Sequence, residues 1–449
     1  MNQASATLGA VAMQPVAATK QDTGLPELLL ALGATSIVLG LIWDISWHIS
    51  IGRDTFWTPA HMAIYAGGVL GGCVGGWLAF QHTFLVPISS ASSVRVFGLR
   101  APLGAWVAIW GALAMVTSAP FDDWWHNAYG LDVKIVSPPH AVLGLGMFGI
   151  SIGAVLLAAA RQNRACASEH DRNTCTDAPT LHAPDAPHAL PSLHAPHAQT
   201  LFIYAGGIFV LIGVVFLTEY TFPNMQHAAF FYYACSVMIP FRLVALSRAG
   251  RTTWPATRIA AVYMIFVCLM LWILPLFPAQ PKLAPIYTRV THMVPPAFPL
   301  LLVFPAAAID LVLRGVGAPN SISARWIPMA GSRRNGIRRS VEVIPEPLRQ
   351  MALAVALGAI FLLVFMAVQW FFAEFMLSSY AKNWFFAGDR SFGYGAGAGD
   401  WRTRFWHQDA SRPGADLLSF SKVLFSWALA AVASWVGLIW GGWMRKVQR

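Results

Sequence analysis

Long apolar runs dominate the chain and alternate with short polar stretches. Several runs exceed the roughly 20 residues that a helix needs to cross a bilayer. The pattern predicts an all-α, polytopic transmembrane helical bundle, because a β-barrel would show short alternating segments instead. Prolines fall near the starts or breaks of the runs, where they disturb a helix least. About ten spans are predicted, over residues 27–47, 60–82, 102–119, 139–161, 200–219, 227–247, 255–277, 292–314, 350–378 and 419–444.

Polar stretches divide these spans into units. Residues 1–25 have no basic n-region and no compact apolar core, so we expect a flexible tail rather than a cleaved signal peptide. Residues 26–161 form a four-helix unit, and residues 199–449 form a six-helix unit. The loop between them, 162–198, is rich in His, Pro and Ala and is expected to be disordered. It either gathers cytoplasmic metal loosely or is a linker with accidental histidines.

Composition agrees with a membrane protein and suggests its orientation. Of the 449 residues, 56% are hydrophobic and only 11% are charged, whereas soluble domains carry roughly 25% charged residues. The net charge of +10 gathers in alternate connections and at the C-terminus. Basic short loops mark the cytoplasm, so both termini are expected there, and the charge needs no nucleic-acid partner. The expected location is the bacterial inner membrane.

A pattern of one carboxylate and two imidazoles occurs twice at the ends of the first four spans. In each copy an Asp and a His are four residues apart, so they share one helix face. A second His then opens the next span. Two histidines and one carboxylate form a known ligand set for divalent transition metals. The sequence therefore predicts two metal sites near the outer face, one made by Asp44, His48 and His61 and the other by Asp122, His126 and His140.

Further polar residues lie near the same face. Asp54 and Asp132 occupy matching places in the two connections, and each is expected to hold an imidazole in orientation. Arg53 is expected to pair with Asp54, or with Asp44 when no metal is bound. Asp123 is an alternative carboxylate, off register by one. The weaker candidates, for which ordinary placement of polar residues at helix ends is the better explanation, are Glu219, His227, His292 and His407.

The types of ligand limit the metals that suit these sites but do not single out one metal. Imidazole with carboxylate suits copper, zinc, iron or nickel. Copper leads the order of affinity, and no thiolate lies near either set. Copper is the expected cofactor, with iron or zinc as alternatives.

A later segment, residues 383–413, is rich in Trp, Phe, Gly and Arg. Aromatic side chains of this kind suit the bilayer–water interface. The segment is expected to anchor there, with a lid over the outer face as the second interpretation.

The first Asp/His set lies in a specific local sequence, Asp44-x3-His48-x12-His61 with Trp47, Arg53-Asp54-Thr55 and Thr58-Pro59. This closely resembles the metal-site motif in the C subunit of the particulate methane and ammonia monooxygenases. In that family the set binds copper within the membrane. A second family set, Asn-x3-His-x13-His, maps onto Asp122, His126 and His140, with Asp in place of Asn. The resemblance covers about residues 26–160, so the rest would be a C-terminal helical extension.

The resemblance implies a membrane-embedded, copper-dependent monooxygenase or its metal-bearing subunit, which activates O2 to hydroxylate a small apolar substrate. It also implies other membrane or cupredoxin-like subunits as partners beside the bilayer, in an oligomer. The alternative from another class is a transport or delivery protein for copper or another transition metal. A third interpretation is a membrane protein whose Asp/His sets only hold helix ends together.

Overall fold

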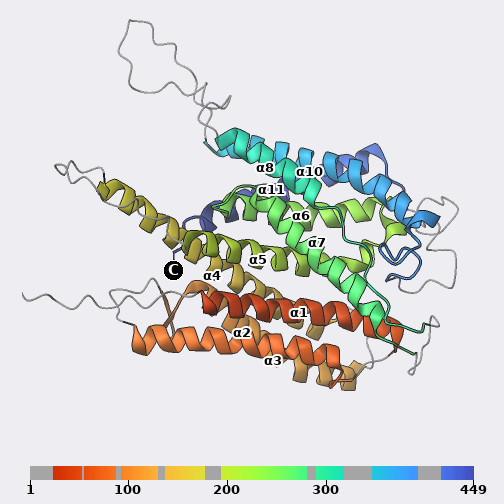
Figure 1. Ribbon diagram of the computed structural model, residues 1–449, viewed down its shortest axis with the longest axis horizontal. Helices are drawn as coiled ribbons and strands as arrows, with labels where there is room; N and C mark the ends of the chain where they lie inside the picture. The colour runs from red at the N-terminus through yellow and green to blue at the C-terminus, as the bar shows by residue number, and fades with distance from the viewer. Residues whose placement is uncertain are drawn as a thin grey trace, which may run out of the picture.

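The computed structural model describes residues 24–52, 55–86, 93–129, 137–176, 194–280, 290–317, 346–392 and 416–448. Within these ranges the side chains of residues 126, 168–176 and 194–195 lie outside the description. The described chain is mainly helical and contains only two strands of three residues each, which confirms the all-α prediction. Figure 1 shows an elongated bundle with α1 to α4 on one side, α6 to α11 on the other and α5 between them.

Nine helices among the described residues are long and apolar enough to cross a membrane. Length and composition thus indicate an integral membrane protein. The long helices are α1 (Leu25–Ser50), α2 (Pro59–Phe80), α3 (Leu103–Tyr129), α4 (Pro138–Thr176), α5 (His194–Val215), α6 (Ala229–Ala249), α7 (Pro255–Ile273), α10 (Glu346–Leu377) and α11 (Phe420–Met444). The shorter elements are η1 (Gln81–Leu85), η3 (Thr218–Tyr220), η4 (Pro223–Met225), η5 (Leu274–Leu276), η6 (Ser379–Ala381), α8 (Val303–Gly317) and the antiparallel strands β1 (Val94–Val96) and β2 (Leu99–Ala101).

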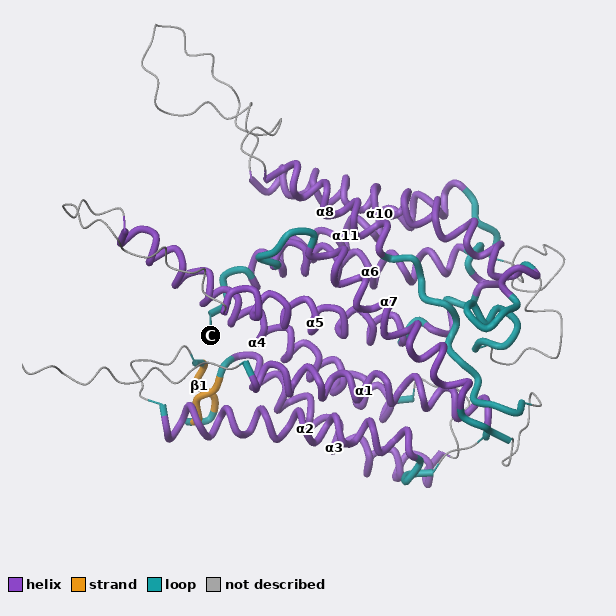
Figure 2. The backbone as a smooth tube through the Cα atoms, viewed as in Figure 1, coloured by secondary structure: helices purple, strands orange, loops and turns teal. Residues whose placement is uncertain are grey.

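The span predicted over 292–314 differs from a continuous helix. Residues 290–302 are an extended stretch, and α8 begins only at Val303 (Figure 2). Pro295, Pro296 and Pro299 explain the difference, because proline removes a backbone donor and pushes the residue before it out of the helical region. Non-helical backbone is tolerated in a membrane protein where other protein groups satisfy it.

The loop expected over 162–198 is shorter than predicted. Helix α4 continues to Thr176, α5 begins at His194, and residues 177–193 lie outside the described chain. Asn163 is buried and donates to the carbonyls of Met444, at 2.8 Å, and Val447, at 2.7 Å. These hydrogen bonds to the C-terminal segment give the start of the expected loop a fixed place in the bundle.

Both ends of the described chain lie at the same end of the bundle. Near the first residues, Glu27 of α1 lies 3.7 Å from Arg161 of α4, and both are buried. The last residues contact Asn163, two positions after Arg161. Of the expected tail 1–25, residues 1–23 lie outside the described chain. The cytoplasmic placement of this end remains a prediction.

Glycines allow the helices that carry the two Asp/His sets to pack closely. A Cβ added at Gly104 of α3 would lie 2.5 Å from the carbonyl oxygen of Gly153 on α4, and one at Gly111 would lie 2.7 Å from that of Gly146. Only glycine permits such an approach between membrane helices. The pairing of α3 with α4 brings the end of one helix beside the start of the next.

The described part of the aromatic segment, residues 383–392, packs on the bundle. Trp272 donates from Nε1 to the carbonyl of Phe385 at 3.0 Å, and the backbone N–H of Phe392 donates to the carbonyl of Pro295 at 2.9 Å. Phe392 is buried, whereas Trp384 remains exposed. The segment therefore contributes to both packing and surface, and residues 393–413 lie outside the described chain.

Candidate metal centre

Local structure places the first set where α1 ends and α2 begins. Asp44 and His48 lie on the last turns of α1, four residues apart and so on one face. Gly52 then adopts a φ of 113°, which glycine tolerates without strain, and the chain leaves the helix. Helix α2 starts with Pro59, whose fixed φ suits a first helical position, so that His61 lies in its first turn.

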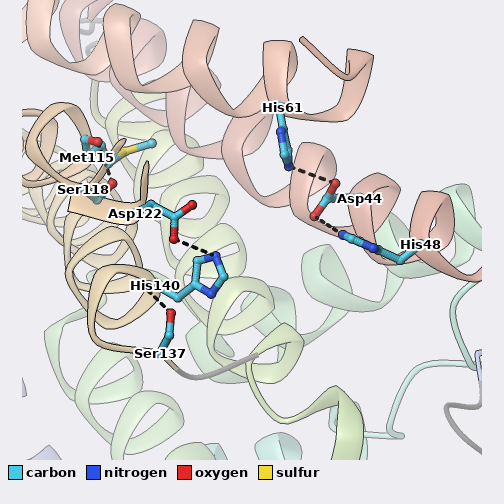
Figure 3. Close-up of polar contacts among 8 residues, drawn as sticks. All are labelled: Asp44, His48, His61, Met115, Ser118, Asp122, Ser137 and His140. Carbon is cyan, nitrogen blue, oxygen red and sulfur yellow. Dashed lines mark hydrogen bonds and ion pairs between the residues drawn. The ribbon is translucent and has the colours of Figure 1, made fainter. Parts of the chain in front are cut away.

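The three side chains of the first set converge. Asp44 Oδ1 lies 3.3 Å from His61 Nε2, and Asp44 Oδ2 lies 3.8 Å from His48 Nε2. Figure 3 shows the carboxylate between the two imidazoles, with one oxygen directed toward each. The Asp44 side chain is 15% exposed, so this end of the bundle shields it from most of the surrounding solvent. One carboxylate thus faces two imidazole nitrogens from two helices.

Some of the distances around Asp44 suit one metal ion bound by Asp44, His48 and His61 together, and others do not. Its Oδ1 atom is buried and, among the described residues, accepts no hydrogen bond in spite of the nearby His61 nitrogen. Two ligand atoms on one tetrahedral ion with bonds of about 2.0 Å lie about 3.3 Å apart, which matches the Asp44–His61 separation. The described side chains contain no group of three or more His, Cys, Asp or Glu already arranged around one metal position. His48, which is exposed, would have to move closer.

The second set is more open. Asp122 Oδ1 on α3 lies 3.7 Å from His140 Nε2 on α4 (Figure 3), and the Asp122 side chain is 33% exposed. Ser137 precedes α4, and its Oγ accepts from the backbone N–H of His140 at 3.5 Å, an N-cap contact. His126 lies on α3 in sequence, but its side chain is outside the described residues.

The two sets share one architecture. In each, the carboxylate lies near the end of a long helix, and the partner His is the third residue of the next helix, which begins with Pro59 or Pro138. Because α1 to α4 run alternately up and down, both sets lie at the end of the bundle opposite Glu27 and Arg161. The repeat in the sequence therefore corresponds to a repeat in space.

The supporting candidates divide into three groups. Arg53, Asp54, Asp132 and His407 lie outside the described residues. Asp123 is exposed and accepts a hydrogen bond from Asn127 Nδ2 at 3.3 Å, away from the imidazoles that define the sets. Glu219 and His292 are exposed, and His292 Nδ1 lies 3.0 Å from Thr291 Oγ1. The structure does not bring these three residues into either set.

His227 has a packing role. Its ring stacks on Trp370, with centroids 3.7 Å apart and planes 12° apart, and its Nε2 lies 3.1 Å from the Trp370 carbonyl. Burial lowers the pKa of the His227 imidazole, although the Trp370 carbonyl and the Glu374 carboxylate oppose this shift. A neutral ring held in this way joins the start of α6 to α10.

Sequence reasoning passed over two buried polar groups in the second half. Asp310 of α8 accepts hydrogen bonds from Ser247, Ala256 and Thr257, and Gln369 of α10 donates to Gln226 Oε1 at 2.7 Å. The sequence signal for both residues was a charged or amide side chain within an apolar run. Its partners come from distant helices and have no local pattern.

The chain matches no protein-family model, and comparisons with curated proteins and solved structures found no match. The length and composition of the helices indicate the class of protein, an integral membrane protein built as a helical bundle. What this bundle does is inferred from its two Asp/His sets.

Proposed function

We propose that the protein is a membrane-embedded, copper-dependent monooxygenase or the metal-bearing subunit of one. The observation that carries this proposal is the position of Asp44 between His48 and His61, on two helix ends. The Asp122–His140 pair at the equivalent helix junction supports a second site. The local likeness to the C subunit of the methane and ammonia monooxygenases agrees with this choice of metal and reaction.

In this proposal Asp44, His48 and His61 hold one ion, and Asp122, His126 and His140 hold the other. Neutral imidazoles donate their lone pairs, and each carboxylate compensates part of the cation's charge. Bound copper would supply the redox chemistry that activates O2 and hydroxylates a small apolar substrate. The protein contributes ligands that two rigid helix ends present together.

Aromatic residues beside the first set suit a substrate that arrives from the bilayer. Phe56 and Trp57 are exposed, with rings 5.0 Å apart, and Phe56 lies 5.1 Å from Tyr65, whose ring is 6.0 Å from His61. An apolar molecule in the membrane could reach the first set along such a surface without crossing water. The sites would then lie near the outer face of a bacterial inner membrane, where further membrane or cupredoxin-like subunits can deliver electrons.

Metal content tests the proposal directly. The full chain, purified in mild detergent and loaded with copper, should hold about two ions, because each set offers two imidazoles and a carboxylate. His48→Ala and His126→Ala should each remove about one, whereas His292→Ala, an exposed histidine outside both sets, should remove none. Unchanged copper in both folded variants would overturn the two-site proposal. Zinc or iron in preference to copper would keep the sites and reject the copper chemistry.

A second assay separates the enzyme from a carrier. Copper-dependent O2 consumption that both variants lose supports the oxygenase. Copper flux into liposomes without O2 consumption would instead support transport or delivery. Loss of folding with neither activity would support a role in holding the helix ends together.

A further inference from the structure

A pocket of about 40 Å³ lies between the two halves of the bundle. Its wall is formed by α1, α5, α7, the extended stretch 290–302 and the segment after α10. Residues that represent these elements are Ile42, Leu211, Tyr263, Val267, Leu300 and Phe392. Ile42 is two residues from Asp44, and side chains two apart on a helix point to nearly opposite sides. The pocket is therefore separate from the Asp44 set, and the inference does not rest on metal binding.

The extended stretch gives the pocket a fixed wall. The backbone N–H of Leu301 donates to Gln369 Oε1 at 3.1 Å, and the carbonyl of Pro295 accepts from Phe392 at 2.9 Å. Ser50 Oγ accepts from the N–H of Val294 at 2.8 Å. Hydrogen bonds to three other elements hold this backbone, so the pocket exists before a ligand arrives. Thr218 and Phe298 are only partly buried and mark its open side.

One donor in the pocket is unused. The Tyr263 hydroxyl accepts from the N–H of Leu300 at 3.0 Å, and its own proton has no acceptor within the described part of the chain. The side chain is 1% exposed, so bulk water does not replace that acceptor. Thr218 and Thr221 also line the pocket, but their hydroxyls donate to the carbonyls of Val215 and Thr218. A buried donor without an acceptor costs free energy that a ligand can recover.

We propose that this pocket binds a small uncharged molecule of about three non-hydrogen atoms, with an apolar body and one oxygen or nitrogen that accepts the Tyr263 proton. The size follows because one water needs about 10–15 Å³ of such space. None of the described residues that line the pocket is charged, and an ion there would lose its hydration without compensation. A molecule this small binds with about millimolar affinity.

Crystals of the full chain test this with two probes. Xenon reports apolar space, and acetonitrile has three non-hydrogen atoms with one acceptor and no strong donor. Both should occupy the pocket, with the acetonitrile nitrogen beside Tyr263. Tyr263→Phe should weaken acetonitrile about fivefold, the worth of one hydrogen bond, and leave xenon unchanged. Occupancy measured against probe concentration gives both values.

A pair of matched variants on α7 controls for general effects. Val267→Phe fills the pocket and should exclude both probes, whereas Ile265→Phe, at a position that is 56% exposed, should exclude neither. Ordered water in place of xenon, or equal acetonitrile binding in wild type and Tyr263→Phe, would overturn the proposal. If Val267→Phe does not fold, the comparison of acetonitrile binding between wild type and Tyr263→Phe still tests the proposal. Copper content is independent of these results, so this proposal and the metal proposal can fail separately.

Discussion

Two carboxylates of this bundle, Asp310 and Asp44, have opposite surroundings. Asp310 is 1% exposed and accepts from Ser247 Oγ at 2.6 Å, Thr257 Oγ1 at 2.8 Å and the backbone N–H groups of Ala256 and Thr257 at 3.2 and 2.9 Å. Asp44 faces His48 and His61, and its buried Oδ1 accepts no hydrogen bond among the described residues. Asp310 accepts hydrogen bonds from several donors, whereas Asp44 faces two imidazole nitrogens, a kind of atom that commonly binds metals.

The difference separates a structural carboxylate from a ligand candidate. Asp310 satisfies two orphan N–H groups at the start of α7, where the helix dipole also favours negative charge. It joins α8, α7 and α6 through these hydrogen bonds. Asp44 adds little to the packing, because its separations of 3.3 and 3.8 Å from the two imidazoles do not amount to hydrogen bonds. Its placement is easier to explain by a cation than by stability.

Asp310→Ala should have the largest effect on stability. The change leaves two hydroxyls and two backbone N–H groups buried without their acceptor, which should lower the free energy of unfolding by about 3–5 kcal/mol. Asp310→Asn retains an acceptor oxygen and should cost clearly less. Denaturation in mixed micelles measures both variants. If Asp310→Ala unfolds like the wild type, the network is not what joins these helices.

Asp44→Asn should have the opposite effect to Asp310→Ala, with little loss of stability but a large loss of metal affinity. We expect a change of less than about 1 kcal/mol in the metal-free chain, since Asp44 makes only weak pairs. Copper affinity at the first site should fall by at least about 100-fold, because the ion loses its anionic ligand. Competition with a chromophoric chelator measures the affinity, and Asp123→Asn, an exposed carboxylate next to the second set, is the control. A strongly destabilised Asp44→Asn with unchanged copper binding would make Asp44 structural after all.

The two metal sets should also differ from each other. Asp122 is more exposed than Asp44, and its contact with His140 is longer than that of Asp44 with His61. The first site should therefore bind copper more tightly, by about tenfold, as a difference of one well-placed ligand would produce. With one equivalent of copper added, His61→Ala should lower retention and His140→Ala should barely change it. Equal losses would show that the two sites are equivalent.

The sequence predicts the Asp44 set better than it predicts the hydrogen bonds of the extended stretch before α8. Asp44, His48 and His61 depend on local rules, a helical spacing and a proline that starts the next helix, so their approach could be foreseen. The extended stretch before α8 could be suspected from Pro295, Pro296 and Pro299. Its partners could not, because they lie on distant elements: Ser50, Tyr263 and Gln369. Tertiary hydrogen bonds of this kind leave no periodic signal in the chain.

The smallest expected effect concerns His227, which belongs with Asp310 as a packing residue. Because burial lowers its pKa in the folded chain, the unfolded chain binds more protons just below the ordinary value of about 6.5. Stability should therefore fall as the pH drops from about 6.5 through the lowered pKa, by less than about 1.4 kcal/mol per pH unit. His227→Phe keeps a ring that can stack on Trp370 and removes the titratable group. The unfolding temperature of this variant should therefore not show the fall caused by protonation of His227. An identical pH profile in the variant would mean that the stacked imidazole does not resist protonation, and would move His227 back among the ligand candidates.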